Sequence, residues 1–285
     1  MTPRIFLVLA TVLMSLSSGC RARAEGVPAV QMTTIAYVTG PGADPVKQRL
    51  DLFRPAGGSD LPVLLFAHGG VWQRGDKDDY RHIGEAYARR GVLTAVVSYR
   101  LAPAARHPAQ AQDMARAVAW LVRHASEYGA RADRIYLSGH SAGGHLVSLL
   151  LFDPQYLRAE GVDPETLGGI IPLSGVFDLT KAMDDTPGGG LDRYVYPTFG
   201  DDRRGLEEAS PINHLHPTRV PLLVILAGND YQGMLKQSEM FVEALRKRGI
   251  PVTFETIKGR DHFELVQAIG QPGDLTTETI TRFLR

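Results

Sequence analysis

The sequence predicts one doubly wound α/β domain built on a mostly parallel sheet of eight strands. Short apolar runs alternate with longer segments of helical periodicity along most of the 285 residues. Most of these runs contain few polar residues, which is typical of parallel strands that are buried on both faces. A chain of this length can cover such a sheet with helices on both sides.

The expected strands are of two kinds. Two early segments alternate apolar and polar residues and predict an antiparallel edge pair joined by a Pro/Gly turn: 34–38 and 49–53. Continuous apolar runs predict five buried strands, and one further strand follows them: 63–67, 93–97, 135–137, 170–173, 222–227 and then 252–257.

The expected helices lie between these strands, at residues 80–90, 109–128, 142–152, 237–248 and 277–284. In the second, Met114, Val118, Leu121 and Val122 recur at helical spacing, which predicts a side that faces the core. The segment 178–221 has several acidic residues, three consecutive glycines and little periodicity. A loop this long is usually functional or disordered, and we expect it to form a small cap over a substrate pocket.

Composition narrows the classes of function. Lysine plus arginine equal aspartate plus glutamate at 31 each, so no net charge favours nucleic acid or an anionic membrane surface. The chain has one cysteine, Cys20, so disulfides and thiol catalysis are not expected after removal of the leader. His214 and His216 lack partners at metal-ligand spacing, and we expect neither a metal nor a cofactor.

The first 24 residues are expected to be an export signal and residues 25–285 the folded domain. Arg4 precedes an apolar stretch at 5–16 that is too short to span a bilayer, and Ser17-Ser18-Gly19-Cys20 follows. This segment resembles a bacterial lipoprotein signal, although Ser17 stands where leucine is commonest. Ala22-Arg23-Ala24 offers a competing cleavage site. Either route exports the protein, to the periplasm or to the cell envelope through a lipid on Cys20.

The motif that carries chemistry is Gly139-His140-Ser141-Ala142-Gly143, between an expected strand and an expected helix. Such a turn gives its serine strained backbone angles and needs small neighbours, which the two glycines provide. It exposes the Ser141 hydroxyl and leaves the Ala142 N–H at a helix start, where developing negative charge is stabilised. Ser141 is therefore the candidate nucleophile.

A serine nucleophile needs a base and an acid that orients the base. The candidate base is His262, on the loop after the last strand, and the candidate acid is Asp230, directly after the preceding strand. The chain order Ser, Asp, His supports this assignment. Asp261 is a poor rival, because adjacent side chains project in different directions.

The candidate oxyanion hole follows the strand at 63–67 and reads His68-Gly69-Gly70-Val71-Trp72. Glycines allow backbone N–H groups to approach a substrate carbonyl closely. We expect Gly70, Val71 and Ala142 to donate, with Gly69 letting the loop bend. His68 is expected to brace the loop, and Trp72 is a candidate for the substrate pocket.

Together these residues resemble the α/β-hydrolase superfamily over nearly all of the mature chain. Within it the chain is similar to the carboxylesterase branch that includes bacterial hormone-sensitive-lipase-like esterases and arylformamidases. The similarity extends to Tyr99-Arg100-Leu101-Ala102-Pro103 and Ser174-Gly175-Val176-Phe177-Asp178. Esterases of this branch often carry a third glycine at the position of Val71, and their acid often lies in an Asp-Pro-Leu run. This chain has Asn229-Asp230-Tyr231-Gln232 instead, and both departures favour the formamidase-like side.

The resulting hypothesis is a serine hydrolase that cleaves small carboxylic esters through an acyl-enzyme. One alternative keeps the mechanism and changes the bond to an amide, as in an arylformamidase. The other is a non-catalytic binding protein of the cell envelope, which would have no need of a triad.

Overall fold

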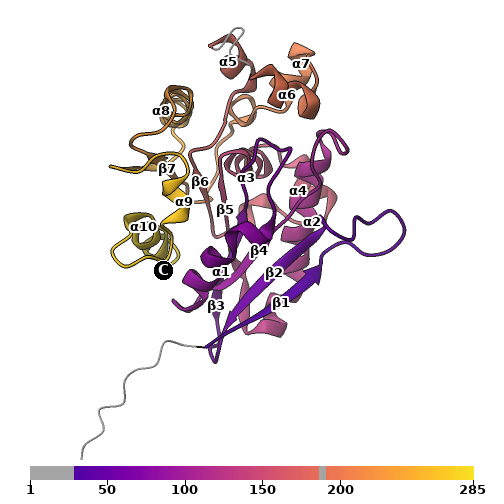
Figure 1. The fold of residues 1–285 in the computed structure, drawn as a ribbon, viewed down its shortest axis with the longest axis vertical. Helices are drawn as coiled ribbons and strands as arrows, with labels where there is room; N and C mark the ends of the chain where they lie inside the picture. Colours follow the sequence, from indigo (N-terminus) through magenta and orange to yellow (C-terminus); the bar gives the residue numbers. More distant parts are fainter. Residues whose placement is uncertain (1–28, 186–190) are drawn as a thin grey trace, which may run out of the picture.

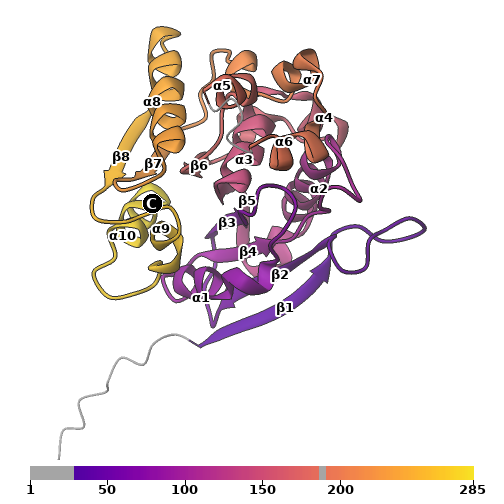
Figure 2. The same ribbon diagram turned by 45° about the horizontal axis from the view of Figure 1, so that its top comes forward.

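The computed structural model describes residues 29–185 and 191–285 (Figures 1 and 2). The expected export signal, with Cys20 and Ala24, lies outside the described residues, as do the three consecutive glycines at 188–190. Among the described residues, no helix combines the length and the apolar character needed to cross a membrane.

One eight-stranded sheet organises the described chain, in the order β1-β2-β4-β3-β5-β6-β7-β8. Its strands are β1 (Val30–Ala36), β2 (Arg49–Pro55), β3 (Leu61–Ala67), β4 (Leu93–Val97), β5 (Ala130–His140), β6 (Gly169–Leu173), β7 (Leu223–Ala227) and β8 (Thr253–Ile257). The β1–β2 and β2–β4 pairs are antiparallel, and all the other pairs are parallel. The expected antiparallel pair thus lies at one edge of a mostly parallel sheet.

Helices cover both faces of this sheet. They are α1 (Arg81–Ala88), α2 (Ala109–His124), α3 (Ala142–Phe152), α4 (Gln155–Ala159), α5 (Leu179–Asp184), α6 (Asp192–Phe199), α7 (Arg203–Glu208), α8 (Gln232–Lys247), α9 (Glu264–Gln267) and α10 (Leu275–Phe283). Short 3-10 helices are η1 (Lys77–Tyr80), η2 (Ala125–Tyr128), η3 (Pro164–Thr166) and η4 (Pro211–His214).

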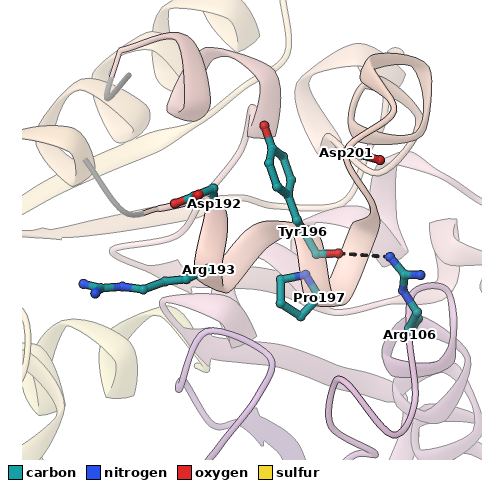
Figure 3. Close-up of a pocket in the computed structure, with 6 residues that line it drawn as sticks. All are labelled: Arg106, Asp192, Arg193, Tyr196, Pro197 and Asp201. Carbon is teal, nitrogen blue, oxygen red and sulfur yellow. Dashed lines mark hydrogen bonds between the residues drawn. The ribbon is translucent and has the colours of Figure 1, made fainter. Parts of the chain in front are cut away.

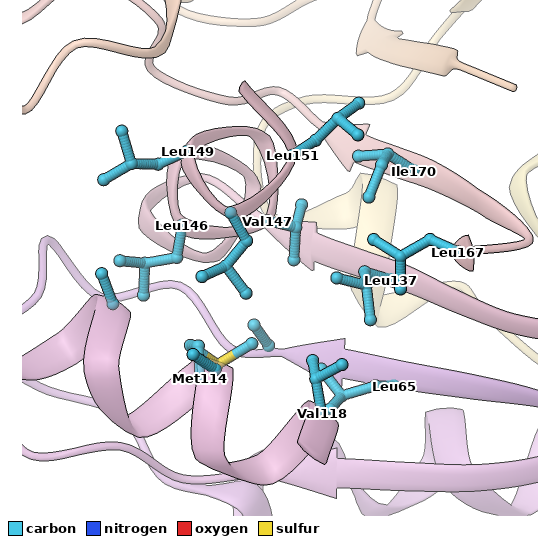
Figure 4. Packing of buried hydrophobic residues seen from close by; sticks show 14 of the residues in the cluster. Leu65, Met114, Val118, Leu137, Leu146, Val147, Leu149, Leu151, Leu167 and Ile170 are labelled. Carbon is cyan, nitrogen blue, oxygen red and sulfur yellow. The ribbon is translucent and has the colours of Figure 1, made fainter. Parts of the chain in front are cut away.

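The alternation of side chains along each strand divides the core into two clusters. On β3, Leu65 belongs to the larger cluster and Leu64 to the smaller one on the opposite face. Met114 and Val118 of α2 contribute to the larger cluster, as the helical spacing predicts (Figure 4). Residues of α3 and α8 share that face, whereas α1, α9 and α10 cover the other.

The segment between β6 and β7 forms α5, α6, α7 and η4. Figures 1 and 2 both show α5, α6 and α7 gathered at one end of the molecule, and we refer to residues 178–221 as the cap. The cap contains more helix than its weak periodicity indicates. Its helices have only six to eight residues each, and Pro197 lies inside α6, so none repeats a pattern for long.

Four hydrogen bonds between described residues hold α6 to the body of the domain. The Gln73 side chain donates to the Arg193 and Tyr194 carbonyls, and the His107 N–H donates to the Thr198 carbonyl. The Arg106 guanidinium adds a fourth, to the Tyr196 carbonyl at 3.0 Å (Figure 3).

This arginine also lines a cavity of about 480 Å³ on α6, with Asp192, Arg193, Tyr196, Pro197 and Asp201. The candidate catalytic residues do not line that cavity.

Candidate active site

Ser141 lies in a sharp turn between the end of β5 and the start of α3. Its backbone has φ 54° and ψ −114°, a combination that costs free energy for a residue with a side chain. The surrounding structure holds it there, because the Ser141 N–H donates to the Leu173 carbonyl at 2.9 Å. The Ser141 carbonyl accepts from the His145 N–H at 3.0 Å, which starts the helix. This is the strained strand–turn–helix that the motif predicts.

The glycines of the motif are required by close backbone contacts. A Cβ at Gly143 would lie 2.2 Å from the carbonyl oxygen of Ala67, and one at Gly139 would lie 2.5 Å from the Gly143 carbonyl. Real side chains do not tolerate such distances, so the turn can pack against β3 only with glycine at these positions.

Asp230 and His262 follow two neighbouring parallel strands, β7 and β8. His262 Nδ1 lies 2.9 Å from Asp230 Oδ1, and each residue is only 6 % exposed. A carboxylate can only accept, so Nδ1 carries the hydrogen and Nε2 of a neutral imidazole keeps its lone pair. The two predicted residues are therefore brought together in the arrangement that a general base needs.

His262 also lies beside the serine turn. Its ring centroid is 4.5 Å from that of His140, the residue directly before Ser141. The oxyanion loop adjoins the same place, because a Cβ on Gly69 would lie 2.9 Å from His140 Nδ1 and 3.3 Å from Ser141 Cβ. The loops that carry Gly69, Ser141 and His262 thus meet around the buried His140 ring.

His140 is a neutral neighbour of His262. Burial, followed by the charge that His262 can carry, lowers the pKa of His140 well below its ordinary value. The His140 ring therefore places no permanent positive charge beside His262.

Asp261, the alternative candidate for the acid that orients His262, makes its hydrogen bonds within its own loop. Its Oδ1 accepts from the N–H groups of Phe263 and Glu264, at 2.9 and 2.8 Å. These bonds cap the turn that leads into α9, so Asp261 stabilises the loop that carries His262.

The expected oxyanion loop has an unusual backbone. Gly70, Val71 and Trp72 have φ values of 111°, 50° and 60°, all in the left-handed region. The Gly70 carbonyl accepts from the N–H groups of Gln73 and Arg74, which closes a tight turn. Within residues 29–185 and 191–285, no group accepts from the N–H of Gly70 or of Val71.

The Tyr99-Arg100-Leu101-Ala102-Pro103 motif braces this loop. The Tyr99 hydroxyl donates to the His68 carbonyl at 2.9 Å, and the Ala102 N–H donates to the Trp72 carbonyl at 2.9 Å. The His68 ring stacks on Tyr99 with centroids 4.3 Å apart, and burial lowers the pKa of His68 to about 4. A neutral, stacked His68 fits the bracing role expected from the sequence.

Trp72, a candidate for the substrate pocket, is only 3 % exposed. Its indole N–H donates to His145 Nδ1 at 3.2 Å, and its ring meets Phe199 of the cap edge-on at 4.8 Å. His145 Nε2 in turn donates to the Ala209 carbonyl at 2.8 Å. The indole therefore connects the oxyanion loop, α3 and the cap. Sequence reasoning missed this connection, because Phe199 and Ala209 lie far from Trp72 along the chain and follow no motif.

In the part of the chain that the structure describes, no group of three or more His, Cys, Asp or Glu side chains is arranged to hold a metal ion.

Comparison with known proteins places this chain among hydrolases. The BD-FAE family model matches residues 50–245, which include the oxyanion loop, Ser141 and Asp230. Kynurenine formamidase of the zebrafish Danio rerio is 26 % identical over 268 residues, covering 91 % of this chain and 86 % of that enzyme. The probable carboxylic ester hydrolase LipM of Mycobacterium tuberculosis is 33 % identical over 195 residues, covering 65 % of this chain but only 45 % of LipM.

Solved structures agree on the fold. Esterase B of Lactobacillus rhamnosis superposes with a TM-score of 0.76 at 23 % identity, over 91 % of this chain and 87 % of that one. Together with the observed strand order, this likeness confirms the predicted fold.

Proposed function

The chain belongs to the BD-FAE family of α/β-hydrolases, and from that premise we propose that it cleaves small carboxylic esters through an acyl-enzyme on Ser141. The observation that carries the proposal is the 2.9 Å contact between His262 Nδ1 and Asp230 Oδ1, in a histidine that adjoins the serine turn. The relatives, a formamidase and a probable carboxylic ester hydrolase, support hydrolysis of an ester or amide carbonyl.

In the proposed mechanism, His262 Nε2 takes the hydroxyl proton as Ser141 Oγ attacks the ester carbonyl carbon. Asp230 holds the ring in the required tautomer and stabilises the imidazolium that forms. The N–H groups of Gly70, Val71 and Ala142 stabilise the oxyanion. The imidazolium then protonates the departing alcohol, and a water molecule deprotonated by His262 releases the acid and restores Ser141.

A panel of short-chain esters tests this proposal. The wild type should hydrolyse p-nitrophenyl acetate and butyrate, and Ser141→Ala should reduce kcat by at least 10³-fold. Ser148→Ala is the matched control, because Ser148 is buried on the same helix and donates only to the Gly144 carbonyl. Hydrolysis by Ser141→Ala at the wild-type rate would overturn the proposal.

An amide substrate of the arylformamidase type is the second candidate. The match to kynurenine formamidase along 91 % of the chain favours it, as do Val71 and the Asn229-Asp230-Tyr231-Gln232 segment. Turnover of a formanilide without turnover of p-nitrophenyl esters would favour the hypothesis of an amide hydrolase. A binding protein of the cell envelope, the third hypothesis, would show neither activity.

We also propose that the chain is exported and carries a lipid on Cys20, on the strength of the leader sequence alone. Mass spectrometry of the mature N-terminus in a bacterial host tests this directly. A diacylglyceryl-modified Cys20 is expected, and an unmodified N-terminus at Glu25 would favour cleavage after Ala24.

A further inference from the structure

Two exposed aromatic side chains stand against the imidazole of His262. The described residues expose six large hydrophobic side chains, and two of these, Tyr231 and Phe263, contact this one ring. Each aromatic ring has its centroid 5.4 Å from that of His262. Tyr231 is 60 % exposed and Phe263 is 53 % exposed, whereas His262 itself is buried.

The backbone fixes both aromatic residues while leaving their rings in solvent. The Tyr231 N–H donates to Asp230 Oδ1 at 2.7 Å, so this residue is tied to the carboxylate that orients His262. The Phe263 N–H donates to Asp261 Oδ1 at 2.9 Å. Because exposed aromatic side chains cost free energy unless something covers them, a pair held beside a reactive ring suggests a ligand surface.

The aromatic and imidazole rings around His262 differ in their exposure to solvent. His140, fully buried, lies 4.5 Å away, whereas Tyr231 and Phe263 border solvent. Among the rings that contact His262, Tyr231 and Phe263 are therefore the ones that a molecule in solvent can reach.

The chemistry of acyl transfer identifies which part of a substrate lies next to His262, Tyr231 and Phe263. In the proposed mechanism, His262 receives the serine proton and then gives it to the departing oxygen, so the leaving alcohol must lie next to the imidazole. The carbonyl oxygen is held instead by the loop at Gly70 and Val71.

We propose that Tyr231 and Phe263 form a leaving-group subsite that binds an aromatic ring on the alcohol side of the ester. This inference rests on the proposed function and names its substrate class, esters of aryl-bearing alcohols. Stacked or edge-on aromatic contacts supply the selectivity, and each is worth about a three- to tenfold preference.

The test compares three esters: benzyl acetate has a ring on the alcohol side, methyl phenylacetate has one on the acyl side, and ethyl acetate has none. Tyr231→Ala and Phe263→Ala should each lower the ratio of kcat/KM for benzyl acetate to that for ethyl acetate about three- to tenfold, chiefly through KM. Tyr231→Phe should preserve the ratio. Leu275→Ala, which removes an equally exposed side chain at the start of α10, is the matched control and should leave the ratio unchanged.

Two results would overturn the subsite. One is an unchanged ratio in the double variant; the other is a selective loss for methyl phenylacetate, which would place the rings on the acyl side. A wild type that hydrolyses none of the three esters would contradict the proposed function instead. The subsite is then tested with Ser141→Ala protein and benzyl alcohol by saturation-transfer NMR. Transfer to the benzyl ring is expected, and its persistence in the Tyr231→Ala/Phe263→Ala background would overturn the proposal.

Discussion

Nδ1 of His262 lies 2.9 Å from Oδ1 of Asp230, across the ends of two neighbouring parallel strands. The two residues are 32 positions apart in the chain and are equally buried. Their pairing follows from the fold, because parallel strands bring successive carboxyl ends to one edge of the sheet.

This pairing predicts different results at two aspartates of the same region. Asp230→Asn should lower kcat for p-nitrophenyl acetate on the order of 10³- to 10⁴-fold, because an amide nitrogen there would favour the wrong tautomer of His262. Asp261→Asn is the control: it weakens a loop cap and should lower kcat by less than about threefold. Equal losses at the two positions, measured by steady-state kinetics, would contradict the assignment of Asp230.

A second prediction concerns the backbone of the oxyanion loop. A Cβ at Gly70 would lie 2.1 Å from the Arg74 carbonyl oxygen, so Gly70→Ala must displace the turn that carries the Val71 N–H. We expect kcat to fall about 10²- to 10³-fold, the usual cost of losing an oxyanion donor.

Gly40→Ala separates this steric effect from backbone strain. Gly40 has φ 98°, close to the 111° of Gly70, but nothing lies within 4 Å of its added Cβ. This variant should lose some thermal stability and keep its kcat. A Gly70→Ala enzyme with wild-type kcat would exclude the loop from oxyanion binding.

Stability should depend on pH through His145. Burial lowers the pKa of His145 to about 3, from about 6.5 in the unfolded chain. Below pH 6.5 the unfolded state therefore binds a proton that the folded state excludes. The free energy of unfolding decreases as the pH is lowered. One such histidine accounts for about 2 kcal/mol between pH 7.5 and pH 5.

Urea denaturation at pH 7.5 and pH 5 measures this effect. His145→Phe should be less stable than the wild type at pH 7.5, since the bonds to Trp72 and Ala209 are lost. Its further loss of stability on acidification should nevertheless be smaller than that of the wild type by about 2 kcal/mol. Parallel pH dependences would show that His145 is not held neutral.

The fourth prediction concerns the attachment of the cap. Gln73→Ala removes the two side-chain bonds to the Arg193 and Tyr194 carbonyls. Tryptic cleavage after Arg193 should become roughly three- to tenfold faster, in line with about 1 kcal/mol of lost attachment. Gln112→Ala, at an exposed position of α2, is the control and should leave the cleavage rate unchanged. An unaltered rate in Gln73→Ala would mean that other contacts hold α6.

Local patterns determined much of this fold in advance. The helix after Ser141 spans the predicted residues 142–152, because a glycine-rich turn and a polar Asp153 bound a largely apolar stretch. Helix α8 begins at Gln232 rather than at the predicted residue 237, because its first five residues include Gly233 and none of them is buried, so they add no buried position to a core-facing stripe. The cap helices were not predicted individually, since they are too short to repeat an apolar stripe.

The candidate site was likewise predicted only in part. Chain order and turn chemistry led to Ser141, Asp230 and His262, whose motifs are local. Contacts between distant segments escaped prediction, among them the Trp72–His145 bond and the aromatic pair around His262. Tyr231 and Phe263 are ordinary neighbours of Asp230 and His262 in the sequence, and only their exposure in the folded chain distinguishes them.

Intact-mass measurement after treatment with a fluorophosphonate tests the central claim most directly, because this reagent traps an activated serine. The wild type should gain one phosphonyl group, mapped to Ser141 by peptide sequencing. His262→Ala should react at least 10²-fold more slowly, and Ser141→Ala should gain no mass. Stoichiometric labelling of Ser141→Ala, or equally fast labelling of His262→Ala, would contradict a serine activated by His262.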